Sequence, residues 1–159
     1  MIGRRSAALS RLDGDRASWH HGRVTPLPDE VRRLFEGPNY AHLATVLPSG
    51  APHSVPVWTA VRGEHVLFFT QPASRKARNL ERDPRVAFSI TDHEHPYRMA
   101  QVRGRVVETV HDVAALEIID GLAMKYTGRP FPMRSGVVFL IEVERVQTMQ
   151  LPFEHAPTA

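Results

Sequence analysis

Short apolar runs, either alternating with polar residues or continuous, recur along the chain from residue 40 onward and are separated by turn-forming residues. Such runs are typical of β-strands. We predict six strands, over residues 40–47, 51–61, 65–70, 85–91, 97–109 and 137–146. Because most connections between them are short, neighbouring strands are expected to pair antiparallel. The pattern therefore predicts a mainly β fold, a six-stranded antiparallel barrel with small helices between its strands.

Three segments show the helical period or helix boundary signals instead. They are residues 29–35, 75–82 and 111–126. The first begins with two acidic residues after a proline, and the second follows Ser74, a favoured helix N-cap. The third places apolar residues three and four positions apart. We expect a short helix at each of these places.

Proline and glycine change the expected roles of two strands. Pro52 and Pro56 lie within the second strand, and proline cannot donate to a strand ladder, so this strand is not expected to be fully paired in the sheet centre. Gly104 lies within the fifth strand, where it indicates a bulge or a sharp bend of the kind that closes barrels.

The charge is concentrated at the N-terminus. The chain has 159 residues and a formal net charge of +3, and residues 1–24 contain five arginines against two aspartates. The remainder is therefore neutral, which argues against nucleic acid as a partner. We interpret residues 1–24 as a basic, flexible arm and residues 25–159 as a single domain, long enough to bury its own core.

Composition excludes several classes of chemistry. The chain contains no cysteine, which rules out disulfides and thiol catalysis and fits a cytoplasmic location. No apolar run is long enough to span a bilayer, so no membrane partner is expected. Rossmann, P-loop and serine-hydrolase motifs are absent. We interpret His93-Glu94-His95 as a turn and expect no metal site.

The clearest candidate chemistry lies where the third strand meets the second helix. Ser74 caps this helix, and Arg75 and Lys76 follow in its first turn. Cations are unfavourable at a helix N-terminus, but they are well placed there to bind a phosphate together with the free amides. The same residues also fit a solvated helix that Ser74 merely caps. The pattern alone leaves both interpretations open.

A second candidate is the segment Pro56-Val57-Trp58. A proline within a strand leaves neighbouring backbone groups free to bind a planar heterocycle, and Trp58 could lie against the edge of that heterocycle. An edge strand that places its tryptophan in the core explains the segment equally well.

Taken in order, these segments resemble the pyridoxamine 5′-phosphate oxidase-like split-barrel superfamily of flavin- and deazaflavin-binding proteins. The resemblance runs from about residue 34 to 108 and, more loosely, to 146. Its motifs are Leu43-Ala-Thr45, Gly50-Ala-Pro52, Ser54-Val-Pro-Val-Trp58, Phe69-Thr70, Ser74-Arg75-Lys76-Ala-Arg78-Asn79-Leu80, Asp83-Pro84-Arg85-Val86 and Gln101-Val102-x-Gly104.

The resemblance implies a six-stranded split barrel of the FMN-binding type and a role for each site residue. Arg75 and Lys76 are expected to hold the cofactor phosphate together with Ser74. Gln101 is expected to reach the cofactor of a partner subunit, because the resemblance implies a homodimer with its cofactor site at the interface. The other expected cofactor contacts are Ser54, Val55, Pro56, Val57 and Trp58 at the ring system, Phe69 and Thr70 at the ribityl chain, and Arg78 and Asn79.

The cofactor implied by the resemblance is F420, with FMN as the alternative. The chain lacks the Arg-x-His-Asp-Arg-like ending of the pyridoxamine phosphate oxidases and is more similar to the actinobacterial F420-dependent branch. We therefore expect an oxidoreductase that transfers a hydride between F420 and a small conjugated or heterocyclic substrate. An FMN-dependent enzyme and a non-catalytic flavin-, deazaflavin- or haem-binding protein are the alternatives. Lys125, Tyr126 and Arg134 are candidates for the substrate mouth, and no catalytic residue is predicted.

Overall fold

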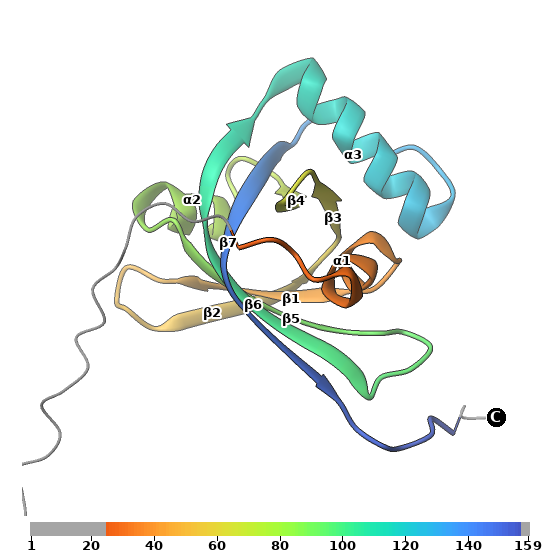
Figure 1. Cartoon of the computed structure of the whole chain (residues 1–159). Helices are drawn as coiled ribbons and strands as arrows, with labels where there is room; N and C mark the ends of the chain where they lie inside the picture. The colour runs from red at the N-terminus through yellow and green to blue at the C-terminus, as the bar shows by residue number, and fades with distance from the viewer. Residues whose placement is uncertain (1–24, 157–159) are drawn as a thin grey trace, which may run out of the picture.

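The computed structural model describes residues 25–156, so the predicted basic arm over residues 1–24 lies outside the described residues. These residues form seven strands and three helices (Figure 1). In chain order they are α1 (Asp29–Glu36), β1 (Ala41–Val46), β2 (Pro52–Val57), β3 (Thr59–Arg62), β4 (His65–Thr70), α2 (Arg75–Arg82), β5 (Arg85–Thr91), β6 (Arg98–Val110), α3 (Asp112–Thr127) and β7 (Val137–Gln150). No helix among residues 25–156 is long and apolar enough to cross a membrane.

The strands form one antiparallel sheet in the order β2-β1-β5-β6-β7-β4-β3. Its two end strands, β2 and β3, are neighbours along the chain and are separated by Trp58 alone. The sheet must therefore curl until its two edges come close together, and Figure 1 shows this curvature in the long strands β6 and β7. The predicted mainly β, antiparallel split-barrel fold is confirmed.

The predicted number of strands was wrong, because the segment 51–61 is two strands rather than one. Its first half pairs with β1 and its second half pairs with β4. The continuous apolar pattern conceals the change of partner, since both halves have residues that face the same core. The prolines fit this arrangement, because β2 lies at a sheet edge and needs hydrogen-bond partners on one side only.

Two apolar clusters hold the sheet and helices together. The inner cluster fills the barrel and includes Phe35 from α1 and Leu80 from α2 together with Phe68 and Phe88 from the strands. Figure 1 places α1 and α2 toward opposite sides of the curled sheet, while α3 lies outside it. The outer cluster packs α3, through Ala115, Ile119 and Leu122, on the outward face of β4 and β7.

The predicted irregularity at Gly104 is confirmed. The register of β6 against β7 shifts between Arg103 and Gly104. A β-carbon at position 104 would lie 2.1 Å from the carbonyl oxygen of Glu142, well inside van der Waals contact. Only glycine allows the two strands to approach this closely, and the close approach accompanies the bend of the sheet.

Candidate cofactor site

The N-terminus of α2 is organised by two hydroxyl groups. The Ser74 Oγ accepts a hydrogen bond from the amide of Ala77 at 3.2 Å, as a helix cap does. The hydroxyl of Thr70, at the end of β4, donates to the same oxygen at 3.0 Å. These two bonds fix the loop between β4 and α2, and so they place the first turn of the helix against the sheet.

The same terminus has free donors for an anion. The amides of Arg75 and Lys76 have no acceptor within residues 25–156, and the first turn contains no acidic residue. Lys76 is half-buried and forms no ion pair among the described residues. Burial lowers the pKa of its ammonium group. A half-buried cation beside free helix amides fits a phosphate, which would stabilise the charged form of the lysine.

Two further predicted contacts in α2 have structural partners. The Arg78 Nη1 donates to the carbonyl of Ala73 at 2.5 Å, across the loop before the helix. Asn79 is 1% exposed, and its Nδ2 donates to the Thr45 hydroxyl of β1 at 3.0 Å. These bonds brace α2 on the sheet. Direct contact of either side chain with a cofactor stays a prediction.

The predicted ring-binding segment lies on edge strand β2. Val55 and Val57 point into the barrel and join its core, whereas Ser54 and Pro56 are exposed on the outer face. Among residues 25–156, β1 is the only strand that pairs with β2, so within this range the backbone on the other side of β2 lies outside the ladder. This free edge can present carbonyl and amide groups to a planar ring, as the sequence suggested.

Trp58 belongs to an aromatic cluster that covers the junction of the two edge strands. Its ring stacks on Tyr126 at a centroid distance of 5.0 Å and lies 6.1 Å from Phe69. Phe131 contacts this group from the loop after α3, with its centroid 5.0 Å from that of Phe69. The structure therefore brings together the predicted contacts Trp58 and Phe69, although they come from different strands.

Tyr126 and Lys125 hold this junction from α3. The Tyr126 hydroxyl accepts from the amide of Thr59 at 3.1 Å and donates to the carbonyl of Asn39 at 2.7 Å, and burial raises its pKa. The Lys125 Nζ donates to the carbonyls of Phe35 and Thr59, and burial lowers its pKa to about 8. These contacts identify supporting roles that helical periodicity could not reveal.

The third candidate for the substrate mouth, Arg134, is held in a surface ion pair. Its Nη1 lies 2.9 Å from the Asp120 carboxylate. The same carboxylate also accepts from the amide of Phe131 at 3.1 Å. Arg134 therefore helps to fix the loop that carries Phe131. Contact of Lys125, Tyr126 or Arg134 with a substrate stays a prediction.

Gln101 lies apart from the α2 and β2 residues. It is exposed on the outer face of β6, and the cross-strand partners that lead from it to β2 are Ser89, His42 and Pro56 in turn. Three strand spacings separate Gln101 from Pro56, which is roughly 14 Å along the sheet. Gln101 and Pro56 lie on the same outer face of the sheet but are not in contact within one chain.

The candidate residues differ in exposure: Ser54, Pro56, Arg75 and Arg78 are exposed, whereas Val57, Thr70 and Asn79 are buried. Two cavities of the described part of the chain, of about 410 and 210 Å³, are lined by other residues. Within residues 25–156, no three histidine, aspartate or glutamate side chains are arranged to hold a metal ion.

Residues 27–150 match the pyridoxamine 5′-phosphate oxidase family over most of the chain. The chain belongs to this family. The resemblance inferred from the ordered motifs is thus confirmed, and with it a family of flavin- and deazaflavin-binding oxidoreductases. No curated protein is similar enough in sequence to count as a relative.

Solved structures of similar proteins share this fold. This family member is 32% identical to an F420 reductase, with a TM-score of 0.68, covering 76% of this chain and 98% of the reductase. It is 26% identical to the conserved hypothetical protein Rv2991 from Mycobacterium tuberculosis, with a TM-score of 0.65 and coverage of 86% and 95%. HupZ from Group A Streptococcus shares the fold, at 19% identity, a TM-score of 0.60 and coverage of 82% and 99%.

Proposed function

We propose that this protein is an F420-dependent reductase that transfers a hydride between the deazaflavin and a small conjugated or heterocyclic substrate. The observation that carries the proposal is the N-terminus of α2, where half-buried Lys76 has no ion-pair partner within residues 25–156 and lies in the same turn as free amides. The 32% identity to an F420 reductase supports F420 as the cofactor. We also expect the protein to act in the cytoplasm, which cell fractionation can test.

The residues of the site suit the parts of such a cofactor. Ser74, Arg75 and Lys76 would hold the phosphate, and Thr70 would support the adjoining ribityl chain. The free edge of β2 would face the ring system, and Trp58 with Phe69 would shield it from water. F420 supplies the hydride chemistry when bound, while the protein binds, orients and shields the reacting partners.

Further cations along α2, beyond the first turn that would hold the phosphate, support F420 over FMN. The tail of F420 continues beyond its phosphate with carboxylates, whereas FMN ends at its phosphate. Arg78 and Arg82 are both exposed on α2, and each donates to a backbone carbonyl, of Ala73 and Val46 respectively. Since a guanidinium has five N–H donors, each arginine keeps donors for the additional anions.

We further propose that the cofactor site is completed by a second copy of the chain. One row of side chains on the outer face of the sheet, from β1 to β7, contains no formally charged residue: His42, Ser89, Gln101 and Gln147. The neighbouring row contains Arg103 and Arg145. Interface centres are depleted in charged side chains and interface rims are polar, so a symmetric dimer contact centred on the first row suits this face. Such a contact would bring Gln101 of one subunit toward the proposed cofactor site of the other.

Titration of the purified protein with F420 and with FMN tests the cofactor. We expect F420 to bind more tightly, and Lys76→Ala to weaken F420 binding by about 1.5–3 kcal/mol, the size of a charged hydrogen bond. Arg62→Ala is the matched control, because Arg62 is exposed at the end of β3. Tighter binding of FMN would make the FMN-dependent alternative correct. Failure of the folded protein to bind either cofactor would reject both enzymes.

Turnover separates an enzyme from a carrier. We expect the F420-loaded protein to oxidise the reduced cofactor when planar conjugated acceptors are added, followed by the absorbance of F420. Binding of F420 without hydride transfer to any tested acceptor would favour the non-catalytic alternative.

Light scattering on a sizing column tests the dimer. We expect a mass of two chains, and we expect Ser89→Arg to yield monomers with weaker cofactor binding, because it places a charge in the uncharged row at the centre of the proposed contact. Val113→Arg is the control, since Val113 is exposed on α3 away from this face. A native monomer that binds F420 fully would contradict the shared site without contradicting the cofactor.

A further inference from the structure

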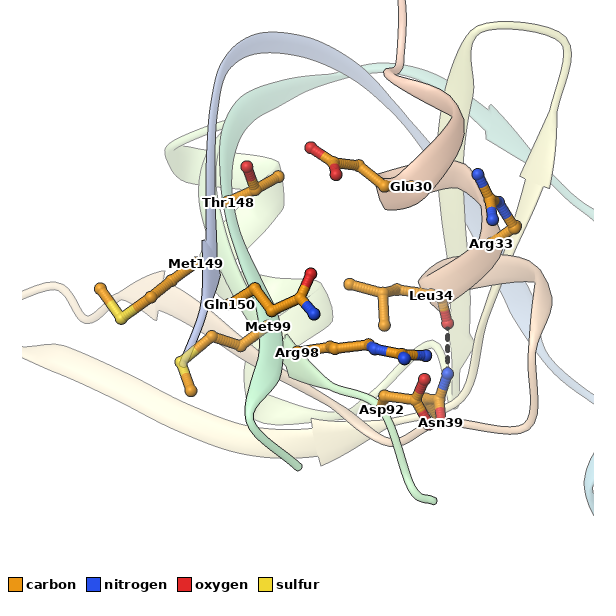
Figure 2. Close-up of a pocket in the computed structure, with 10 residues that line it drawn as sticks. All are labelled: Glu30, Arg33, Leu34, Asn39, Asp92, Arg98, Met99, Thr148, Met149 and Gln150. Carbon is orange, nitrogen blue, oxygen red and sulfur yellow. Dashed lines mark hydrogen bonds between the residues drawn. The ribbon is translucent and has the colours of Figure 1, made fainter. Parts of the chain in front are cut away.

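A cavity of about 410 Å³ lies between α1 and the ends of β6 and β7 that project beyond the barrel. Figure 2 shows its lining. Its lining includes four charged side chains, those of Glu30, Arg33, Asp92 and Arg98, and three polar uncharged ones, those of Asn39, Thr148 and Gln150. Figure 1 places α1 and α2 toward opposite sides of the barrel, so this cavity is separate from the anion site on α2. Its volume is in the range of small-molecule sites.

The floor of the cavity is held by the buried side chain of Asn39. Asn39 is 7% exposed, and its Nδ2 donates to the carbonyl of Leu34 at 2.9 Å. Its Oδ1 accepts from the amide of His93 at 2.8 Å. One buried amide thus ties the end of α1 to the loop between β5 and β6 at the floor of the cavity.

The charged groups of the walls are not paired with one another. Within residues 25–156, none of the four forms an ion pair. Arg33 comes from α1 and Arg98 from β6, and Figure 2 shows them on different walls. The Asp92 Oδ1 accepts from two loop amides, which leaves the other oxygen of this carboxylate available. Two guanidinium groups and two carboxylates therefore line one cavity with no net charge.

We propose that this cavity binds a free α-amino acid with a polar side chain. The Arg98 guanidinium would bind its carboxylate, and the Glu30 carboxylate, on the other side of the cavity in Figure 2, would bind its ammonium group. Thr148 and Gln150, whose side chains point toward the cavity in Figure 2, would hydrogen-bond the polar side chain. A phosphate would be repelled by the two carboxylates, and a simple amine by the two arginines. A zwitterion satisfies both sets of charges at once.

Calorimetry with three related probes tests this proposal. L-Glutamine carries both charges, glutaramate lacks the ammonium group, and 4-aminobutanamide lacks the carboxylate. We expect L-glutamine to bind at least about tenfold more tightly than either analogue. Glycine, the smallest zwitterion, is expected to bind more weakly than L-glutamine and to be weakened in the same way by Arg98→Gln.

Variants locate the binding. Arg98→Gln and Glu30→Gln are each expected to weaken L-glutamine binding about tenfold. Arg103→Gln is the matched control, because Arg103 is on the same strand but exposed on the outer face of the sheet. The proposal is overturned by equal binding of the three probes, by an Arg98→Gln variant that binds like the control, or by no binding of L-glutamine and glycine up to about 10 mM. These results are independent of F420 binding.

Discussion

Trp58 and Tyr126 stack face to face, with ring centroids 5.0 Å apart and an interplanar angle of 4°. Trp58 is the single residue between the two edge strands of the sheet, and Tyr126 lies in the last turn of α3. The Tyr126 hydroxyl also bonds to the backbone of Thr59 and Asn39. Through this pair, α3 holds the chain at the point where it crosses from one edge of the sheet to the other.

Removal of the Tyr126 hydroxyl should destabilise this junction. Tyr126→Phe is expected to lower the free energy of unfolding by about 1–3 kcal/mol, because it leaves a partly buried amide and a carbonyl without their partner. Urea denaturation measures this change. Tyr40→Phe is the control, since Tyr40 is 54% exposed. Removal of its hydroxyl should lower the free energy of unfolding by less than about 0.5 kcal/mol. Equal effects of the two variants would show that the hydroxyl bonds contribute nothing specific.

Ser74 can be separated into a helix cap and a ligand contact. Ser74→Ala removes the acceptor for the Ala77 amide and should cost about 1 kcal/mol of stability. Ser74→Asp keeps a capping oxygen and should largely retain stability, but its negative charge should weaken F420 binding by repelling the phosphate. Denaturation and F420 titration measure the two effects. An aspartate variant that binds F420 as tightly as the native protein would remove this helix end from the site.

Gly104 should tolerate no side chain. Gly104→Ala would place a β-carbon 2.1 Å from the Glu142 carbonyl oxygen, so the strands must shift, at an expected cost of about 1–3 kcal/mol or more. Thermal and urea unfolding measure the loss. Gly121→Ala is the opposite case, because nothing lies within 4 Å of that position in α3, and alanine should stabilise the helix by about 0.5–1 kcal/mol. If both substitutions changed the free energy of unfolding in the same direction, the close approach of the strands at Gly104 would not explain its effect.

Lys125 should make stability increase with pH over part of the alkaline range. Burial lowers its pKa in the folded protein to about 8, against 10.5 as the ordinary value. Between these values the unfolded chain binds more protons than the folded one, so the unfolding free energy rises with pH. We expect the native protein to gain stability relative to Lys125→Met between about pH 7.5 and 9.5, measured by denaturation at each pH.

The upper limit avoids Tyr126, whose raised pKa acts in the opposite direction at higher pH. A difference between the two proteins that is independent of pH would show that Lys125 titrates normally.

Features that depend on neighbouring residues were predictable from the sequence. The cap at Ser74, the end of α2 before Pro84 and the bulge at Gly104 each follow from the conformations that these residue types allow. The edge position of the strand with Pro52 and Pro56 follows from the missing N–H groups. The order of these local signals along the chain was enough to indicate the family. The phosphate site at the N-terminus of α2 stays a prediction.

The partner change at Trp58 could not be predicted, because an apolar pattern indicates which residues are buried and not which strand covers them. For the same reason Asn79 is indistinguishable in sequence from an exposed polar residue, although its partner Thr45 lies on another strand. The cavity of Arg33 and Arg98 unites side chains that are far apart along the chain.

Local order, helix caps, turns and the charge pattern of α2 are therefore properties of the sequence alone, since each depends on a few adjacent residues. The split of the sheet, the stacking of Trp58 on Tyr126, the burial of Asn79 and the separation of Gln101 from Pro56 arise when distant segments pack together. Packing sets which groups lose water and which find a partner, and these two outcomes distinguish a ligand site from a structural contact.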